Sequence, residues 1–294
     1  MCQFCTEHGE GKKWYLEMKN YSRELLHAEL SAKEREVTRV SSRAEWLGHY
    51  LEYIEGPAIT GIPKTLVEIG MALAPTAELR GPGASEEEIL EQRKISHFGQ
   101  VIPIEDVEKV IDLADSITRI PCGCRFLSTG KSNARYCFGL GVSKWGSFKG
   151  LPDASSSLEV LDKQEAKRII REYDQEGLIH SVWTGITPYL IGVCNCDHDC
   201  LAYKMYIEQR GLPSFFRAEY VCRVDPELCS GCKDCIKQCQ FGAQFYSSAL
   251  GKIYIDPTRC FGCGVCRAAC PTDAIQLLPR EEDPQAAGVW LKYA

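Results

Sequence analysis

The sequence has no long apolar run. Its most apolar stretch, TLVEIGMALA at residues 65–74, carries a glutamate and is too short to cross a bilayer. The first twenty residues are charged throughout and contain no hydrophobic segment of the kind found in signal peptides. We therefore expect a cytoplasmic protein with no membrane span.

Several functional motifs are also missing. The net charge is −6, and no basic tail or alternation of aromatic and basic residues suggests contact with nucleic acid. There is no P-loop, no G-x-S-x-G and no H-E-x-x-H, and GLGVSKWG lacks the glycine spacing of a dinucleotide site. The sequence predicts no nucleic-acid partner and no flavin site, and it leaves any catalytic residues unknown.

Cysteine, in contrast, is abundant. The chain of 294 residues contains 17 cysteines in an otherwise ordinary composition. In a reducing compartment disulfides are rare, so clustered cysteines point to metal or redox chemistry.

The apolar periodicity predicts an α+β protein with a mostly helical N-terminal half. Helices are expected at residues 13–55, 63–74, from Ser85, 103–117, 162–177 and 198–210, strands at 178–183, 188–193 and 217–225, and a long loop at 126–160. We expect three regions: residues 1–100, helical; 101–215, a cysteine-rich α/β middle; and 216–294, a C-terminal domain with its own cysteines and a tail.

The strongest signal is a duplicated cysteine run. CSGCKDCIKQC and CFGCGVCRAACP both have the spacing C-x2-C-x2-C-x3-C. Three cysteines of a run cover one face of a cubane cluster, and the fourth ligates the cluster of the other run. This predicts two [4Fe-4S] ligand sets: Cys229, Cys232, Cys235 and Cys270 for one cluster, and Cys239, Cys260, Cys263 and Cys266 for the other. Paired zinc ribbons, the alternative, would require longer gaps between the cysteine pairs.

These runs resemble the bacterial two-cluster ferredoxin family over residues 217–280. The resemblance implies transfer of single electrons. One departure is Gln240, where the first run would usually have proline.

A second cysteine group lies in the middle of the chain. PCGCR contains Cys122 and Cys124, CNCDHDC contains Cys194, Cys196 and Cys200, and Cys137 lies between these motifs. Two C-x-C pairs brought together supply the four thiolates of a cubane, with Cys137 and Cys200 as spare ligands or neighbouring thiols. We therefore predict a third iron–sulfur cluster; zinc or another single metal, and no metal at all, remain the alternatives.

Residues 100–280 resemble a poorly characterised group of ferredoxin-fused iron–sulfur proteins of anaerobic prokaryotes. The resemblance rests on IPCGCR, the helix DKQEAKRIIREYDQEG and CNCDHDC. This chain departs from the group at residues 197–199, where some relatives have cysteine or glycine.

The remaining candidates have simpler explanations. Cys222 alternates with apolar residues on an expected strand and is interpreted as a buried structural thiol. His198 is interpreted as solvated. Cys2, Cys5 and His8 either have no role or form a metal site completed by other residues. A basic segment between Arg125 and Pro152 has no acidic residue. It is either a flexible surface loop or a segment that compensates a nearby cluster, docks an acidic partner or holds a phosphate-bearing ligand.

Three functions follow from these patterns. The first is an electron-transfer protein or subunit of an anaerobic oxidoreductase complex, with an oxidoreductase or flavoprotein as redox partner. The second is a reductase whose substrate-reducing centre is the site at 122–200, fed by the ferredoxin domain. The third, a redox sensor or assembly factor, lacks a DNA-binding element to accompany it.

Overall fold

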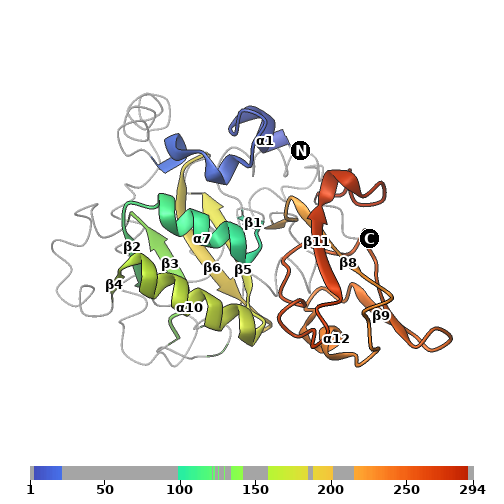
Figure 1. Ribbon diagram of the computed structural model, residues 1–294. Coiled ribbons are helices and arrows are strands. Elements are labelled where there is room, and N and C mark those ends of the chain that lie inside the picture. The colour runs from blue at the N-terminus through green and yellow to red at the C-terminus, as the bar shows by residue number, and fades with distance from the viewer. Residues whose placement is uncertain are drawn as a thin grey trace, which may run out of the picture.

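The structure is a computed structural model that describes residues 3–21, 99–120, 122, 125, 129, 134–141, 158–184, 188–200 and 215–290. Figure 1 shows three parts: a sheet with two helices, a C-terminal module beside it, and an N-terminal segment above the sheet.

The central element is a seven-stranded sheet. Its strand order is β4 (Glu159–Leu161), β2 (Ile117–Ile120), β3 (Cys137–Leu140), β6 (Leu190–Cys196), β5 (Ile179–Thr184), β1 (Gly99–Val101) and β7 (Phe215–Phe216). Neighbouring strands pair antiparallel, except that β1 and β7 are parallel. The sheet is therefore built mainly from contacts between segments that are distant in sequence.

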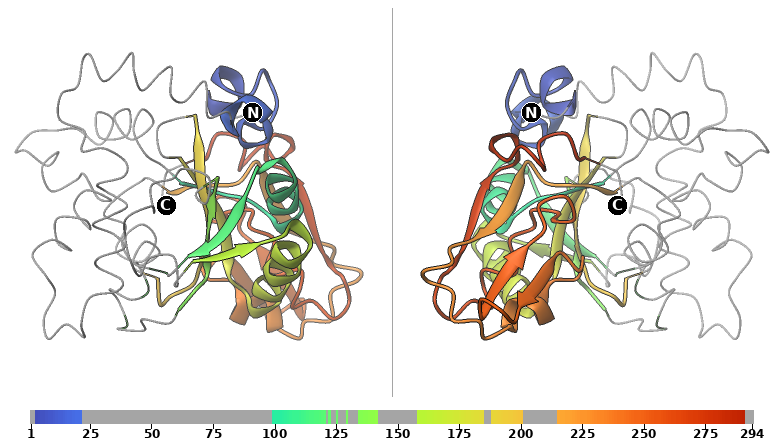
Figure 2. Two further views of the ribbon diagram at one scale, coloured as in Figure 1. Left: turned by 90° about the vertical axis from the view of Figure 1, so that its left-hand side faces the viewer. Right: turned by 90° about the vertical axis from the view of Figure 1, so that its right-hand side faces the viewer.

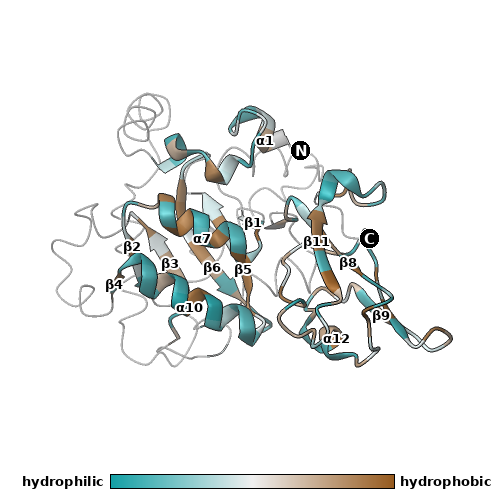
Figure 3. Ribbon diagram, viewed as in Figure 1, coloured by the Kyte–Doolittle hydropathy of each residue, from teal (hydrophilic) through white to brown (hydrophobic). Residues whose placement is uncertain are grey.

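Helices α7 (Ile104–Leu113) and α10 (Lys163–Glu176) cover one face of this sheet, as Figures 1 and 2 show. Figure 3 shows α10 as mainly hydrophilic, interrupted by apolar positions. These apolar positions, Ile170 among them, are buried in one core with Phe138 and Val193 of the sheet. Burying a side chain of this size contributes about 1.5–3 kcal/mol, so this core holds the helices to the sheet.

The ends of α10 follow from its sequence. The Asp162 carboxylate accepts a hydrogen bond from the Glu165 amide at 2.8 Å, which caps the first turn. Gly177 ends the helix with a φ of 85°, a conformation that glycine adopts without steric cost. The predicted helix at 162–177 is confirmed.

The N-terminal segment packs on α7. It consists of α1 (Gln3–Glu7) and the 3-10 turns η1 (Trp14–Leu16) and η2 (Met18–Tyr21). The buried carboxylate of Asp106 accepts hydrogen bonds from Tyr15 Oη at 2.8 Å and Lys13 Nζ at 2.9 Å. A buried charge with its partner in place ties this segment to the sheet part of the molecule.

The prediction of a mostly helical N-terminal half was wrong. The described residues contain four α-helices, which are short, and the fold is rich in antiparallel sheet. Strands β1, β2 and β3 have only three or four residues each, too few to produce a clear alternating pattern. Of the helix predicted at 13–55, residues 13–21 form 3-10 turns, and the remainder lies outside the described residues, as do the helices predicted at 63–74 and from Ser85.

Other predicted elements are present, but they begin or end at different residues than expected. The helix expected at 103–117 ends at Leu113, since β2 begins at Ile117. Strand β6 continues through Cys196, where the sequence suggested irregular chain. The predicted loop at 126–160 contains β3 and part of β4. Most of the helix predicted at 198–210 lies outside the described residues, and the predicted boundaries of the three regions stay predictions.

The C-terminal module contains two small antiparallel pairs. Strand β8 (Tyr220–Val224) pairs with β11 (Ile275–Pro279), and β9 (Gln244–Ser247) pairs with β10 (Lys252–Ile255). The short helix α12 (Asp234–Gln238) follows the first cysteines, and the 3-10 turn η5 (Arg280–Glu282) follows β11.

The module is fastened to the sheet part by specific contacts. Arg267 forms a two-pronged ion pair with Glu105 of α7, with N–O distances of 2.6 and 2.9 Å. The Gln240 amide donates to the carbonyl of Gly177 at the end of α10. Glutamine where proline was expected therefore supplies a docking contact between the two parts. No helix among the described residues is both long and apolar enough to span a bilayer.

Candidate metal centres

The two cysteine runs share one backbone conformation. Gly231 and Lys233 in the first run have φ values of 74° and 72°, and Gly262 and Gly264 in the second have 70° and 81°. Positive φ at equivalent positions folds both segments into the same tight loop. A side chain at Gly262 would collide with the Tyr220 carbonyl oxygen, 2.0 Å from an ideal Cβ, so this loop lies directly against β8.

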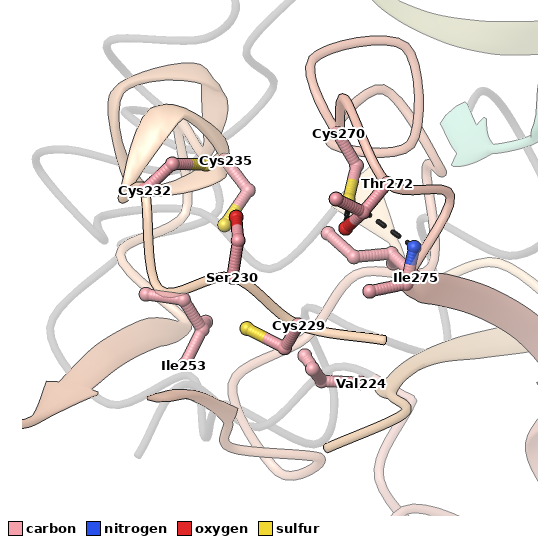
Figure 4. A pocket seen from close by; sticks show the side chains of 10 residues that line it. Val224, Cys229, Ser230, Cys232, Cys235, Ile253, Cys270, Thr272 and Ile275 are labelled. Carbon is pink, nitrogen blue, oxygen red and sulfur yellow. Dashed lines mark hydrogen bonds between the residues drawn. The ribbon is translucent and has the colours of Figure 1, made fainter. Parts of the chain in front are cut away.

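Cys229, Cys232, Cys235 and Cys270, here called site A, surround one small pocket. Figure 4 shows their sulfur atoms pointing toward a common space, with Cys270 opposite the three cysteines of the first run. The wall is completed by apolar side chains, among them Ile253 and Ile275. The structure thus brings together the first predicted ligand set, including its crossed member.

Hydrogen bonds at site A already favour negative sulfur. The Ala274 amide donates to Cys270 Sγ at 3.3 Å. Burial acts to raise the pKa of Cys270, but this amide and that of Thr272 outweigh it and lower the pKa. Burial and the neighbouring thiols raise the pKa of Cys235 to about 11. A metal that binds here must therefore displace protons from the thiols.

Cys239, Cys260, Cys263 and Cys266, here called site B, also form one group. Each thiol lies close enough to others of the set to influence its ionisation. Burial is the main cause that raises the pKa of Cys263, and Cys239 and Cys260 add to it. The Gly262 amide donates to Cys260 Sγ at 3.4 Å. The second predicted set is thus also brought together.

Cys222 lies beside site B. It is 4% exposed, and its Sγ atom is 3.8 Å from Cys266 Sγ. Its backbone amide donates to Cys260 Sγ at 3.4 Å. The prediction of a buried thiol is confirmed. The sequence did not indicate that Cys222 contacts two cysteines of the second run, because this contact arises only from the packing of β8 against that run.

The donors of sites A and B fit [4Fe-4S] clusters. Each site offers four thiols, three from one run and one from the other, with amide donors aimed at sulfur. Across the described residues, no group of three or more His, Cys, Asp or Glu side chains is arranged to hold a single metal ion.

A third group of thiols, here called the middle thiol site, consists of Cys122, Cys137, Cys194, Cys196 and Cys200. Cys194 and Cys196 alternate with Val193 along β6, and Val193 faces the helix-covered core. The cysteines therefore point to the opposite face of the sheet. The Sγ atom of Cys137 on neighbouring β3 lies 3.5 Å from Cys122 Sγ, within hydrogen-bond range.

These thiols influence one another's ionisation. Hydrogen bonds with Cys122 and Cys194 lower the pKa of Cys137 well below its ordinary value. Hydrogen bonds with Cys194 and Cys200 raise the pKa of Cys196. The five described cysteines thus form a continuous series of interacting thiols. Cys124, the sixth predicted member, lies outside the described residues.

Arg125 supplies positive charge at this site. Its side chain is 3% exposed, stacks over the Tyr136 ring at 4.2 Å, and pairs with Asp197 at 2.7 Å. Cys122 and Cys200 lie near enough to act electrostatically on the guanidinium. Asp197, one of the departures from the related group, therefore anchors a cation beside the thiols. His198 is exposed.

An apolar cluster connects the middle thiol site with site B. Cys196 and Cys200 are buried in the same cluster as Phe261 and Cys263, and Cys194 packs against it. Phe241 stacks on Phe261 with ring centroids 3.9 Å apart. Site B, between this cluster and site A, therefore faces the sheet part of the molecule, while Cys232 of site A is exposed.

Two members of the predicted N-terminal cluster, Cys5 and His8, lie in the described part of the chain. The Cys5 thiol is buried and donates to Glu219 Oε1 at 3.0 Å, and His8 stacks on Phe4. Cys2 lies outside the described residues. The described part of this segment packs against the module.

The fold and the paired thiol sites define a protein with a C-terminal ferredoxin domain for two [4Fe-4S] clusters, a module that transfers single electrons. Residues 228–275 match the 4Fe-4S dicluster domain family. The resemblance of the C-terminal region to two-cluster ferredoxins is thus confirmed.

Three similar proteins illustrate the range of relatives. An archaeal-type glutamate synthase [NADPH] of Thermotoga maritima is 35% identical over 72 residues, 24% of this chain and 14% of that protein. The indolepyruvate oxidoreductase subunit IorA of Thermococcus kodakarensis is 26% identical over 117 residues, 39% of this chain and 17% of that subunit. Ferredoxin-1 of Caulobacter vibrioides is 41% identical over 68 residues, 22% of this chain and 56% of that ferredoxin. The chain thus covers only a small part of the first two relatives.

Proposed function

We propose that this protein is an electron-transfer protein or subunit of an oxidoreductase complex. Sites A and B each hold one [4Fe-4S] cluster through the crossed ligand sets. A [4Fe-4S] cluster accepts and returns one electron at a time. The chain's own residues supply the thiolates, the amide donors that offset their charge, and the apolar walls that limit access of water.

The middle thiol site holds a third iron–sulfur cluster in this proposal. Cys122, Cys194 and Cys196 are among its ligands, together with Cys124, and Cys137 and Cys200 are spare or neighbouring thiols. Support comes from the series of interacting thiols that two separate motifs and β3 form. The buried guanidinium of Arg125 offsets the negative charge that thiolates bring.

The observation that carries the proposal is the shared packing of Cys196, Cys200 and Cys263. These residues lie in one apolar cluster, so the middle thiol site and site B are in direct van der Waals continuity. A ferredoxin domain packed in this way exchanges electrons with the middle thiol site of its own chain. The Glu105–Arg267 ion pair holds the domain against α7.

The redox partner is an oxidoreductase or flavoprotein that meets the protein at site A. Cys232 is exposed there, whereas Cys260, Cys263 and Cys266 of site B are buried. Two of the relatives are named as a glutamate synthase and as a subunit of an indolepyruvate oxidoreductase, which supports an oxidoreductase setting.

Anaerobic purification followed by iron and sulfide quantification and EPR tests this function. We expect about twelve irons per chain, four for each cluster. Replacing Cys122 and Cys194 together by serine should remove about four irons and leave the ferredoxin signals unchanged. The matched control, Cys5→Ser, alters a buried thiol that binds Glu219, and it should retain all the iron. About eight irons in the wild type would disprove the third cluster, and fewer would disprove the ferredoxin assignment.

A further inference from the structure

Site B has a fifth thiol, which lies outside the two cysteine runs. Cys222 lies on β8, outside both cysteine runs, while the runs already provide four thiols to site B. Its Sγ atom is 3.8 Å from Cys266 Sγ, within the range of a hydrogen bond between sulfurs. Once Cys266 binds iron as a thiolate it carries no proton and can only accept, so Cys222 is then the member of the pair that can donate.

The position of Cys222 is imposed by the packing of the module. β8 pairs with β11, with Cys222 opposite Leu277, and the side chain is buried with Cys260 and Cys266 in one cluster. Its amide also donates to Cys260 Sγ. Backbone and side chain of one residue therefore both contact sulfur atoms of site B.

Site A is organised differently. No further cysteine is found among the residues that line its pocket. Instead, the hydroxyl of Thr272 lies 3.7 Å from Cys270 Sγ. The two sites thus have similar ligand sets but different side-chain donors near sulfur.

We propose that the Cys222 thiol is a hydrogen-bond donor to Cys266 of site B and raises the midpoint potential of the cluster held there. The inference rests on the proposed function, since it requires a cluster at site B. A hydrogen bond to a ligating sulfur withdraws charge from the cluster and stabilises its reduced form. The Cys222 thiol then stabilises the reduced state of the site B cluster, which lies beside the middle thiol site. It is a positioning and tuning residue and takes no part in ligation.

An EPR-monitored redox titration of the holoprotein tests this role. Cys222→Ala should lower the midpoint potential of one ferredoxin signal and leave the other unchanged. Cys222→Ser, which keeps a donor, should shift that signal less. Thr272→Val removes the hydroxyl near Cys270 and should move only the other signal. Iron content should equal that of the wild type in all three variants.

Several results would overturn the inference. Unchanged potentials in Cys222→Ala would show that the contact has no electronic effect. Loss of about four irons would show that Cys222 is a ligand. A shift of the same signal by Cys222→Ala and Thr272→Val would place Cys222 at the wrong site. Failure of the proposed function is distinguishable, because it would appear as missing iron in the wild-type protein.

Discussion

At the scale of single residues, Arg125 is a cation whose side chain is buried beside the middle thiol site. A buried guanidinium is costly to remove from water, and here Asp197 and the Tyr136 ring offset that cost. The same placement puts positive charge next to Cys122 and Cys200. Arg125 is the first residue of the basic segment noted in the sequence, and its position allows it to compensate the negative charge of a thiolate centre.

Replacing this charge should weaken the third cluster. We expect Arg125→Gln to lower iron from about twelve toward eight per chain, since the thiolates lose their compensating cation. Arg125→Lys keeps the charge and should retain more iron. The control is Arg119→Gln, which removes a cation of the same sheet that pairs with Glu159. Iron and sulfide analysis measures the effect, and full iron content in Arg125→Gln would contradict it.

Residue identity also explains one departure from the expected ferredoxin pattern. Gln240 reaches the Gly177 carbonyl, a contact that proline has no side-chain donor to make. The sequence revealed the departure but not its use, because the partner lies more than sixty residues away in the chain.

At the scale of elements, the cysteine loop of the second run depends on a glycine against β8. Gly262 has a φ of 70°, and an added Cβ would lie 2.0 Å from the Tyr220 oxygen. Gly251 has a φ of 63° as well, but open space surrounds its Cβ position. A comparison of alanine substitutions at these two glycines therefore separates the strain of a left-handed backbone from the steric clash of an added Cβ.

Gly262→Ala should therefore damage site B, while Gly251→Ala should be tolerated. Both changes carry about 1–2 kcal/mol of strain from left-handed backbone. Only the first forces the loop away from β8 and so misplaces Cys260 and Cys263. We expect loss of the site B signal and of about four irons in Gly262→Ala alone. Equal iron contents of the two variants, measured beside EPR spectra, would refute this account.

Element prediction succeeded where the signal is local. Asp162, Glu165 and Gly177 mark both ends of α10, and β5 follows as a run of buried residues. It failed for β1 and β3, whose few residues form strands only because distant partners pair with them.

At the scale of the whole molecule, the Glu105–Arg267 pair joins α7 to the loop that carries Cys266. Burial acts to raise the pKa of Glu105, but the hydrogen bonds from Arg267 outweigh it and lower the pKa below 4.5. The stabilisation is thus present in full above pH 4.5 and is lost only as the pH falls through the lowered value. At neutral pH the docking contact is complete.

Glu105→Gln should loosen the docking of the ferredoxin domain. At low salt and neutral pH we expect a loss of about 0.5–1 kcal/mol in unfolding free energy, since the pair is partly exposed. High salt should shrink the difference. Glu172→Gln removes an exposed pair with Arg168 within α10 and serves as control. Urea unfolding measures the effect, and amide exchange should show faster exchange where α7 meets the domain. No difference from the control at low salt would contradict the docking role.

The sequence by itself determined α10 and predicted the two ferredoxin ligand sets, because cysteine spacing and helix caps act over a few residues. It also indicated which middle cysteines belong together, and five of the six lie in one series in the structure. Only the tertiary structure decided that β6 carries Cys194 and Cys196 away from the helices, that Arg125 lies among the thiols, and that Cys222 contacts site B. Those relations depend on strand pairing and packing between distant segments, for which a local pattern carries no signal.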